Sequence, residues 1–193
     1  KIEHKAVLNS VKSISKTKNI PLVFLNVDEN GNPDKHQLNK LLQNSDEKTL
    51  VSLIHINNEI GTMIDLNEFG EICASNNALF HSDTVQTIGH YNLDLSKIKI
   101  DFITCSAHKF HGPKGVGFVY VKSGTNLFPL IEGGSQERGF RGGTESIHNI
   151  VGLKAAFQSS YDFLEEDSRK VSKIKEHFIN SIQTSIPNIK ING

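Results

Sequence analysis

Short apolar runs alternate with stretches of helical periodicity along this chain. Apolar residues at helical spacing predict helices over 3–16, 34–42 with Asp34 as its cap, 65–75, 146–164 and 168–186. Continuous or alternating apolar runs predict strands over 21–27, 49–56, 78–81, 100–105 and 117–121. Strands that alternate with helices are typical of α/β domains, so we predict an α/β fold with a mostly parallel sheet.

Composition narrows the range of partners. The 193 residues include 21 basic and 21 acidic side chains and no basic run, so a nucleic-acid partner is not indicated. No apolar stretch approaches membrane-spanning length, and a membrane partner is not expected. Cys73 and Cys105 lack the spacing of a metal or redox motif. We interpret both as buried structural thiols, which favours a reducing, cytoplasmic location, or a mitochondrial one in a eukaryote.

Lys109 is the first candidate for chemistry. It follows the apolar run 101–106 and stands beside Ser106, His108 and a glycine-rich turn. A lysine at a strand end is placed to form a Schiff base with a carbonyl cofactor, because desolvation makes an amine nucleophilic. The alternative is a surface lysine in a turn, which is the ordinary case for a lone lysine.

Asp83 follows a second apolar run and strengthens that interpretation. A carboxylate beside a pyridine nitrogen keeps the nitrogen protonated, so that the ring becomes an electron sink. Gln86, three residues on, is placed to donate to a ring oxygen. The alternative for Asp83 is a helix cap, which aspartate does well. With Lys109 in the same chain, we favour the cofactor.

Other polar residues follow the predicted strands, where α/β sheets bind ligands. The segment Asn57–Gly61, which includes Asn58, either places an amide in a pocket or forms an Asx turn. Ser106 and His108 are placed to bind phosphate, and the glycine-rich loop 133–144 is either an anion cradle or a flexible lid. His4 by itself would be a structural or exposed histidine. His108 and His111 lack a third ligand, so no metal site is predicted.

Five ordered motifs resemble those of one known family. They are Glu-His-Lys-Ala-Val at 3–7, His-Ile-Asn-Asn-Glu-Ile-Gly at 55–61, His-Ser-Asp-Thr-Val-Gln at 81–86, Ser-Ala-His-Lys-Phe-His-Gly-Pro-Lys-Gly at 106–115 and Arg-Gly-Gly-Thr-Glu at 141–145. The chain resembles cysteine desulfurases of the housekeeping and nitrogen-fixation branch. These are pyridoxal 5'-phosphate enzymes of the class V aminotransferase group that supply sulfur for iron–sulfur cluster assembly. The resemblance implies the large domain of the fold type I transferases, a mixed and mostly parallel sheet flanked by helices.

The resemblance also implies roles for particular residues. Lys109 would hold the cofactor and move the substrate α-proton, Asp83 would pair with the pyridine nitrogen, and His4 would stack on the ring and serve acid–base steps. Asn58 and Gln86 would contact the ring oxygen or its surroundings. The phosphate would be held by Ser106, His108 and Thr144. Thr144 would reach the site of the second subunit of a homodimer. L-Cysteine would be the substrate, and a sulfur acceptor or iron–sulfur scaffold protein the partner.

The departures from the family pattern matter as much. Neither Cys73 nor Cys105 matches the nucleophilic cysteine of the family, and the upstream phosphate-binding turn and most of the small domain have no counterpart. We expect residues 1–165 to be a partial cofactor domain and 166–193 a long helix that begins the truncated small domain. On this interpretation the chain cannot release sulfur from cysteine by itself. Two alternatives stay open: a selenocysteine lyase or another class V aminotransferase, and a non-catalytic dimerisation or partner-binding fragment.

Overall fold

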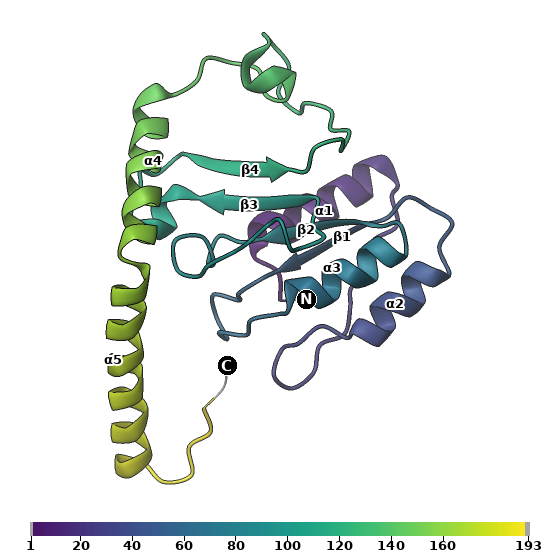
Figure 1. The fold of residues 1–193 in the computed structure, drawn as a ribbon. Helices are drawn as coiled ribbons and strands as arrows, with labels where there is room; N and C mark the ends of the chain where they lie inside the picture. Colours follow the sequence, from purple (N-terminus) through teal and green to yellow (C-terminus); the bar gives the residue numbers. More distant parts are fainter. Residues whose placement is uncertain (1, 192–193) are drawn as a thin grey trace.

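The computed structural model describes residues 2–191 and contains one sheet with helices on both faces (Figure 1). The strands are Leu50–Ile54 (β1), Leu79–Asp83 (β2), Phe102–Ser106 (β3) and Gly117–Val121 (β4). The helices are Lys5–Lys18 (α1), Lys35–Gln43 (α2), Leu66–Ser75 (α3), Ile147–Asp162 (α4) and Leu164–Ser185 (α5). Two 3-10 helices, Ala107–Phe110 (η1) and Gln136–Gly139 (η2), complete the regular structure.

The sheet has the strand order β1-β2-β3-β4. The first three strands are parallel and β4 runs antiparallel to β3, which confirms the predicted α/β fold with a mostly parallel sheet. In this register Ile54 lies opposite Asp83, and Asp83 lies opposite Thr104. The carboxyl ends of β1, β2 and β3 therefore meet at one edge of the sheet, where α/β proteins bind ligands.

The apolar core lies on the face of the sheet that α2 and α3 cover, whereas α1 lies behind the sheet in Figure 1. Phe80 of β2 and Ile103 of β3 are almost completely buried there. Phe69 and Cys73 of α3 pack into the same cluster, because they share the buried face of that helix. Burial of such side chains contributes roughly 1.5–3 kcal/mol each and holds the strands in register.

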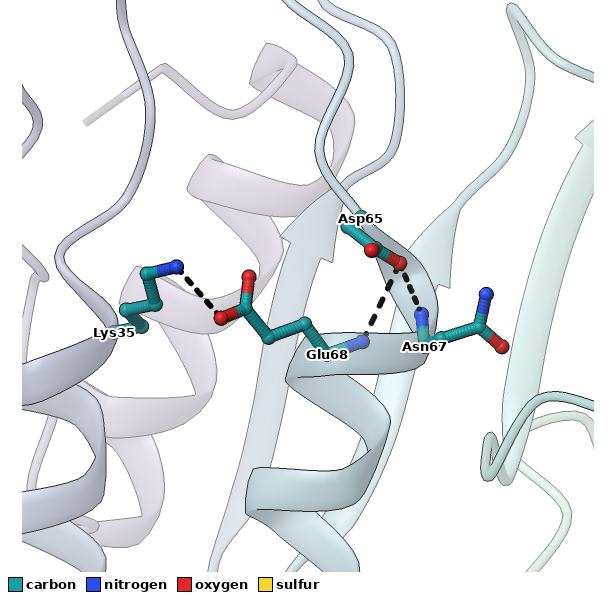
Figure 2. Close-up of polar contacts among 4 residues, drawn as sticks. All are labelled: Lys35, Asp65, Asn67 and Glu68. Atoms are coloured by element: carbon teal, nitrogen blue, oxygen red, sulfur yellow. Dashed lines mark hydrogen bonds and ion pairs between the residues drawn. The ribbon is translucent and has the colours of Figure 1, made fainter.

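Aspartate side chains cap the starts of two helices. Asp34 accepts a hydrogen bond from the Gln37 N–H at 2.9 Å, which confirms the predicted start of α2. Asp65 accepts from the N–H groups of Asn67 and Glu68 at the start of α3 (Figure 2). A cap of this kind contributes about 1 kcal/mol. Figure 2 also shows the 2.6 Å ion pair of Lys35 with Glu68, which joins α2 to α3.

The predicted strand over 21–27 is wrong. In the structure this segment is irregular, and its only β contact within residues 2–191 is an isolated bridge between Val27 and Pro33. The Asn26 N–H donates instead to the side chain of Gln37, at 2.7 Å. Apolar alternation makes a strand only where a neighbouring strand offers backbone partners, and the described part of the chain offers none here.

The last two helices form one column along the side of the sheet and continue beyond it (Figure 1). They are separated only at Phe163, so the two helices predicted from the pattern are confirmed with slightly shifted ends. None of the residues of α5 is buried. The proposed domain division at residue 165 stays a prediction. No helix within residues 2–191 has the length and apolar character needed to cross a membrane.

Candidate active site

Backbone hydrogen bonds bring three polar clusters together at the carboxyl edge of the sheet. The His55 N–H donates to the Asp83 carbonyl at 3.0 Å, just past the end of β1. The Thr84 N–H donates to the Thr104 carbonyl at 3.1 Å and joins the end of β2 to β3. The segments that carry Asn58, Asp83 and Ser106 thus leave adjacent strands, an adjacency that the sequence pattern left open.

Asp83 is the buried acid of this edge. Its side chain is 5 % exposed. Oδ1 accepts a hydrogen bond from the Val85 N–H at 3.0 Å, and within the described residues this is the only hydrogen bond of the carboxylate. Oδ2 is therefore an acceptor left for a bound group. Gln86 follows in the same turn and is half-buried.

Lys109 lies in η1, a rigid turn directly after β3. The buried residues Ala107 and Phe110 anchor this turn, and the Phe110 ring meets Phe157 of α4 edge-on at 6.1 Å between centroids. The Gly112 N–H closes the turn on the Ala107 carbonyl at 2.8 Å. Because the apolar residues point inward, His108 and Lys109 are left exposed.

The side chain of Lys109 forms no ion pair or hydrogen bond within residues 2–191, although its carbonyl accepts from His90 Nε2 at 2.9 Å. The sequence argument expected a desolvated amine, and in this chain the side chain is exposed. Groups that cover Lys109 must therefore supply the desolvation.

His4 caps α1 on the opposite side of β1 from the core. Its Nδ1 accepts a hydrogen bond from the Ala6 N–H at 3.2 Å, while its backbone stays extended. An accepting Nδ1 carries no proton, so a neutral ring has its proton on Nε2. The side chain is exposed. His4 therefore offers a free Nε2 for proton transfer or stacking.

The sequence analysis missed two residues that hold the segment leading into His4, namely Glu3 and Asn57. Glu3 Oε1 accepts a 2.6 Å hydrogen bond from the N–H of Ile54, and burial raises the pKa of this carboxyl to about 7, with a further contribution from the Asp83 charge. Asn57 is buried, and its Nδ2 donates to the Ile2 carbonyl at 2.6 Å. These contacts span more than fifty positions in sequence, so only the adjacency of Glu3 to His4 could have signalled them.

The two asparagines of the 55–61 motif divide their roles. Asn57 Oδ1 accepts from the N–H groups of Glu59 and Ile60, so the Asx turn weighed as an alternative does form, on Asn57. Asn58 is exposed and makes no side-chain hydrogen bond within the described chain. Its assignment to a cofactor stays a prediction.

Side-chain hydrogen bonds join the three parallel strands two residues before Asp83. His81 contacts Ser52 Oγ through Nδ1 at 2.8 Å and Thr104 Oγ1 through Nε2 at 3.3 Å. Burial lowers the pKa of His81, against the opposing effect of Asp83. His81 thus connects the three parallel strands as a neutral imidazole. His81 and Asp83 are two positions apart in β2, so their side chains lie on the same face of the strand.

The loop that carries Thr144 stands apart from the strand ends. Residues 133–144 lie beyond β4, on the side away from β3 (Figure 1). Gly133 packs closely on Gly142, where a Cβ would stand 2.7 Å from the Gly133 nitrogen. The Gly143 N–H donates to Gln136 Oε1 at 3.2 Å, which closes the loop on itself. Thr144 is exposed and has no hydrogen bond to Lys109 or Asp83 in the described structure. The chain alone does not bring Thr144 to the other candidates.

Both thiols are buried, as predicted: Cys73 is 1 % exposed and Cys105 6 %. Desolvation raises the pKa of each to about 12. Because the thiolate is the nucleophile, neither cysteine is suited to attack sulfur at neutral pH. No group of three or more metal-binding side chains occurs within residues 2–191.

We expect neither thiol to react with a soluble disulfide reagent at pH 7 while the protein is folded, and both to react in denaturant. Thiol titration with and without guanidinium measures this. Cys73→Ala and Cys105→Ala should each leave a single thiol to titrate in denaturant and none in the folded protein, because both side chains are buried. Rapid reaction of either thiol in the folded protein would contradict this burial.

The chain is similar to known proteins over its whole length. The Aminotransferase class-V profile matches residues 1–193. The chain is 41 % identical over all 193 residues to a protein of Clostridium botulinum named cysteine desulfurase IscS, and 36 % identical to one of the same name from Dictyoglomus turgidum; it covers 48 % of each. The chain therefore spans about half the length of the curated relatives that it matches.

Solved structures show the same fold. A NifS-like protein superposes with a TM-score of 0.89 at 38 % identity, over 95 % of this chain and 50 % of that one. A NifS-like protein of Rickettsia africae gives 0.89 at 32 %, over 98 % of this chain and 51 % of that one. The match over the whole chain shows that it belongs to the class-V aminotransferases, a family of pyridoxal 5'-phosphate enzymes.

Proposed function

We propose that the whole protein is a cysteine desulfurase, which converts L-cysteine to L-alanine and passes the sulfur to an enzyme thiol. The observation that carries this proposal is the 41 % identity over the entire chain to relatives named cysteine desulfurase. The strand-end arrangement of Asp83, Ser106 and Lys109 supports it. In this reaction a thiolate attacks the substrate sulfur, the bond from Cβ to sulfur breaks, and Cβ gains a proton.

The residues present fit pyridoxal 5'-phosphate. The Asp83 carboxylate is buried and has one oxygen without a hydrogen bond in the described structure, as a partner of a pyridinium N–H requires. The Lys109 amine is without an ion pair in the described chain, so it is available to a carbonyl carbon. Ser106 and His108 flank the start of η1 and offer a hydroxyl and a ring nitrogen to a phosphate. Asn58, Gln86 and Thr144 are the further contacts we propose.

The cofactor, when bound, supplies an electron sink for the substrate α-carbon. The side chains of this chain have distinct tasks around it. Asp83 holds a proton on the ring nitrogen, Lys109 anchors the aldehyde carbon and then moves the α-proton, and His4 exchanges protons through Nε2. The turn from Ala107 to Phe110 fixes Lys109 relative to β3 through its buried residues.

The sulfur nucleophile must come from outside residues 1–193. Cys73 and Cys105 are buried with raised pKa values, so they do not supply the thiolate. We also propose that the protein acts as a homodimer, with Thr144 serving the second subunit, and that a sulfur acceptor or iron–sulfur scaffold protein takes the sulfur. The isolation of the 133–144 loop from the strand ends supports a role at a subunit interface.

A product assay tests the proposal. Full-length protein with cofactor, L-cysteine and a reducing thiol should form alanine and sulfide in equal amounts, measured by mass spectrometry and by sulfide trapping. The 193-residue chain alone should form neither. Turnover by the chain alone would contradict the external nucleophile. Release of selenium from selenocysteine without turnover of cysteine, or formation of a keto acid instead of alanine, would contradict the desulfurase.

A further inference from the structure

The start of α1 is held on the sheet by polar contacts. Glu3 Oε1 accepts from the N–H of Ile54, the last residue of β1, at 2.6 Å. The Ile2 carbonyl accepts from Asn57 Nδ2 at 2.6 Å. Helix α1 itself contains no fully buried residue, and its apolar side chains Val7, Leu8 and Val11 are only half-buried. The segment that leads into His4 is therefore located by these two hydrogen bonds.

This docking point lies beside Asp83. Ile54, which donates to Glu3, is the register partner of Asp83 in the neighbouring strand. The proximity is also electrostatic, because the Asp83 charge acts on the Glu3 carboxyl. The Glu3 side chain thus links the helix start that carries His4 to the end of β1, which lies beside the strand end that carries Asp83.

The cost of this arrangement indicates that it has a role. Glu3 Oε2 is buried and has no hydrogen-bond partner in the described structure. Leaving a buried polar atom unpaired is destabilising, and a second carboxyl near Asp83 adds repulsion whenever both are ionised. A glutamine would make the same contact with Ile54 without the charge. The hydrogen bond to Ile54, which needs the side-chain oxygen and not the charge, accounts for a buried polar group here.

We propose that Glu3 is a positioning residue of the site: it docks the start of α1 on the end of β1 and so fixes His4 relative to Asp83. The inference rests on the proposed function, because that function places His4 and Asp83 around one cofactor. Glu3 itself touches neither the cofactor nor the substrate on this account. Its effect passes through the hydrogen bond to Ile54 and through the backbone of residues 3 and 4.

Two conservative variants separate the effect of the Glu3 side-chain length from the effect of its charge. Glu3→Gln keeps the side-chain length and the acceptor for the Ile54 N–H, whereas Glu3→Asp keeps the charge and is one methylene too short. Glu29→Gln and Glu29→Asp, at an exposed turn position, are the matched controls. Hydrogen exchange of the Ile54 amide, resolved to single residues in cofactor-free full-length protein, measures docking without any need for activity.

We expect Glu3→Asp to raise the exchange rate of the Ile54 amide by about tenfold or more, because the shorter side chain no longer reaches the Ile54 N–H, and Glu3→Gln to stay near wild type. In the holoenzyme, Glu3→Asp should lower kcat by about tenfold with little change in KM, and Glu3→Gln should restore most of kcat. Unfolding midpoints close to that of the wild type are expected for both variants.

Exchange and kcat of Glu3→Asp equal to those of the Glu29 controls would overturn the proposal. A Glu3→Gln variant as impaired as Glu3→Asp would also overturn the proposal, because the length of the side chain would then not explain the effect. Faster exchange with unchanged kcat would overturn the link to His4. The exchange result in cofactor-free protein does not depend on the reaction, so failure of the docking contact is distinguishable from failure of the desulfurase assignment, which the product assay reports.

Discussion

Replacing Lys109 with alanine in the full-length protein is expected to lower alanine formation from cysteine by about a thousandfold or more, since anchoring of the cofactor and proton transfer are lost together. The turn that carries Lys109 should survive, because the buried residues Ala107 and Phe110 hold it and the lysine side chain is exposed. Initial rates at saturating cofactor, together with the absorbance of the bound cofactor, measure the effect.

Lys122→Ala is the matched control for this experiment. Lys122 also follows a strand, β4, and its side chain is exposed, with only a 3.9 Å ion pair to Asp101. Its replacement should leave the rate within about twofold. A Lys109→Ala variant that keeps more than about a tenth of the wild-type rate would contradict the role given to Lys109.

The second large effect is expected at Asp83. Asp83→Asn should lower kcat by about a hundredfold or more and weaken cofactor binding, because the amide no longer provides the charge that keeps the ring nitrogen protonated. The side-chain oxygen that accepts from the Val85 N–H is retained, so the turn after β2 should persist. Titration with cofactor gives the Kd, and rates at saturating cofactor give kcat.

Asp94→Asn provides the comparison, since Asp94 is exposed and also accepts hydrogen bonds from its own turn, from Ser96. It should change neither kcat nor Kd by more than about twofold. If Asp83→Asn behaved like Asp94→Asn, the buried carboxylate would be a local cap only, which is the alternative the sequence left open.

The strands that carry the site could be predicted because their apolar runs are buried on the sheet. Asp34 and Asp65 mark helix starts by a local rule, the preference for an oxygen acceptor at the cap, and both do cap their helices. The same kind of local rule fails at 21–27, where alternation is present and no partner strand is described. The periodicity of apolar residues indicates which side of a helix or strand is apolar. It does not indicate whether another strand is present to pair with the backbone.

Within the site, sequence reasoning located the strand ends and missed the contacts between them. Nothing local distinguishes Asn57, which is buried in an Asx turn, from its exposed neighbour Asn58. The hydrogen bond from Ile54 to Glu3 joins residues 51 positions apart, so it depends on the packing of α1 against the sheet. The resemblance to a family supplied His4, whose isolated position indicated no chemistry.

The account depends most directly on a covalent link between the cofactor and Lys109. The full-length protein is incubated with pyridoxal 5'-phosphate, reduced with borohydride, digested and mapped by mass spectrometry. We predict a single cofactor adduct, on Lys109, and its absence in Lys109→Ala. An adduct on another lysine with Lys109 unmodified, or no adduct at saturating cofactor, would contradict the assignment of this strand edge as the active site.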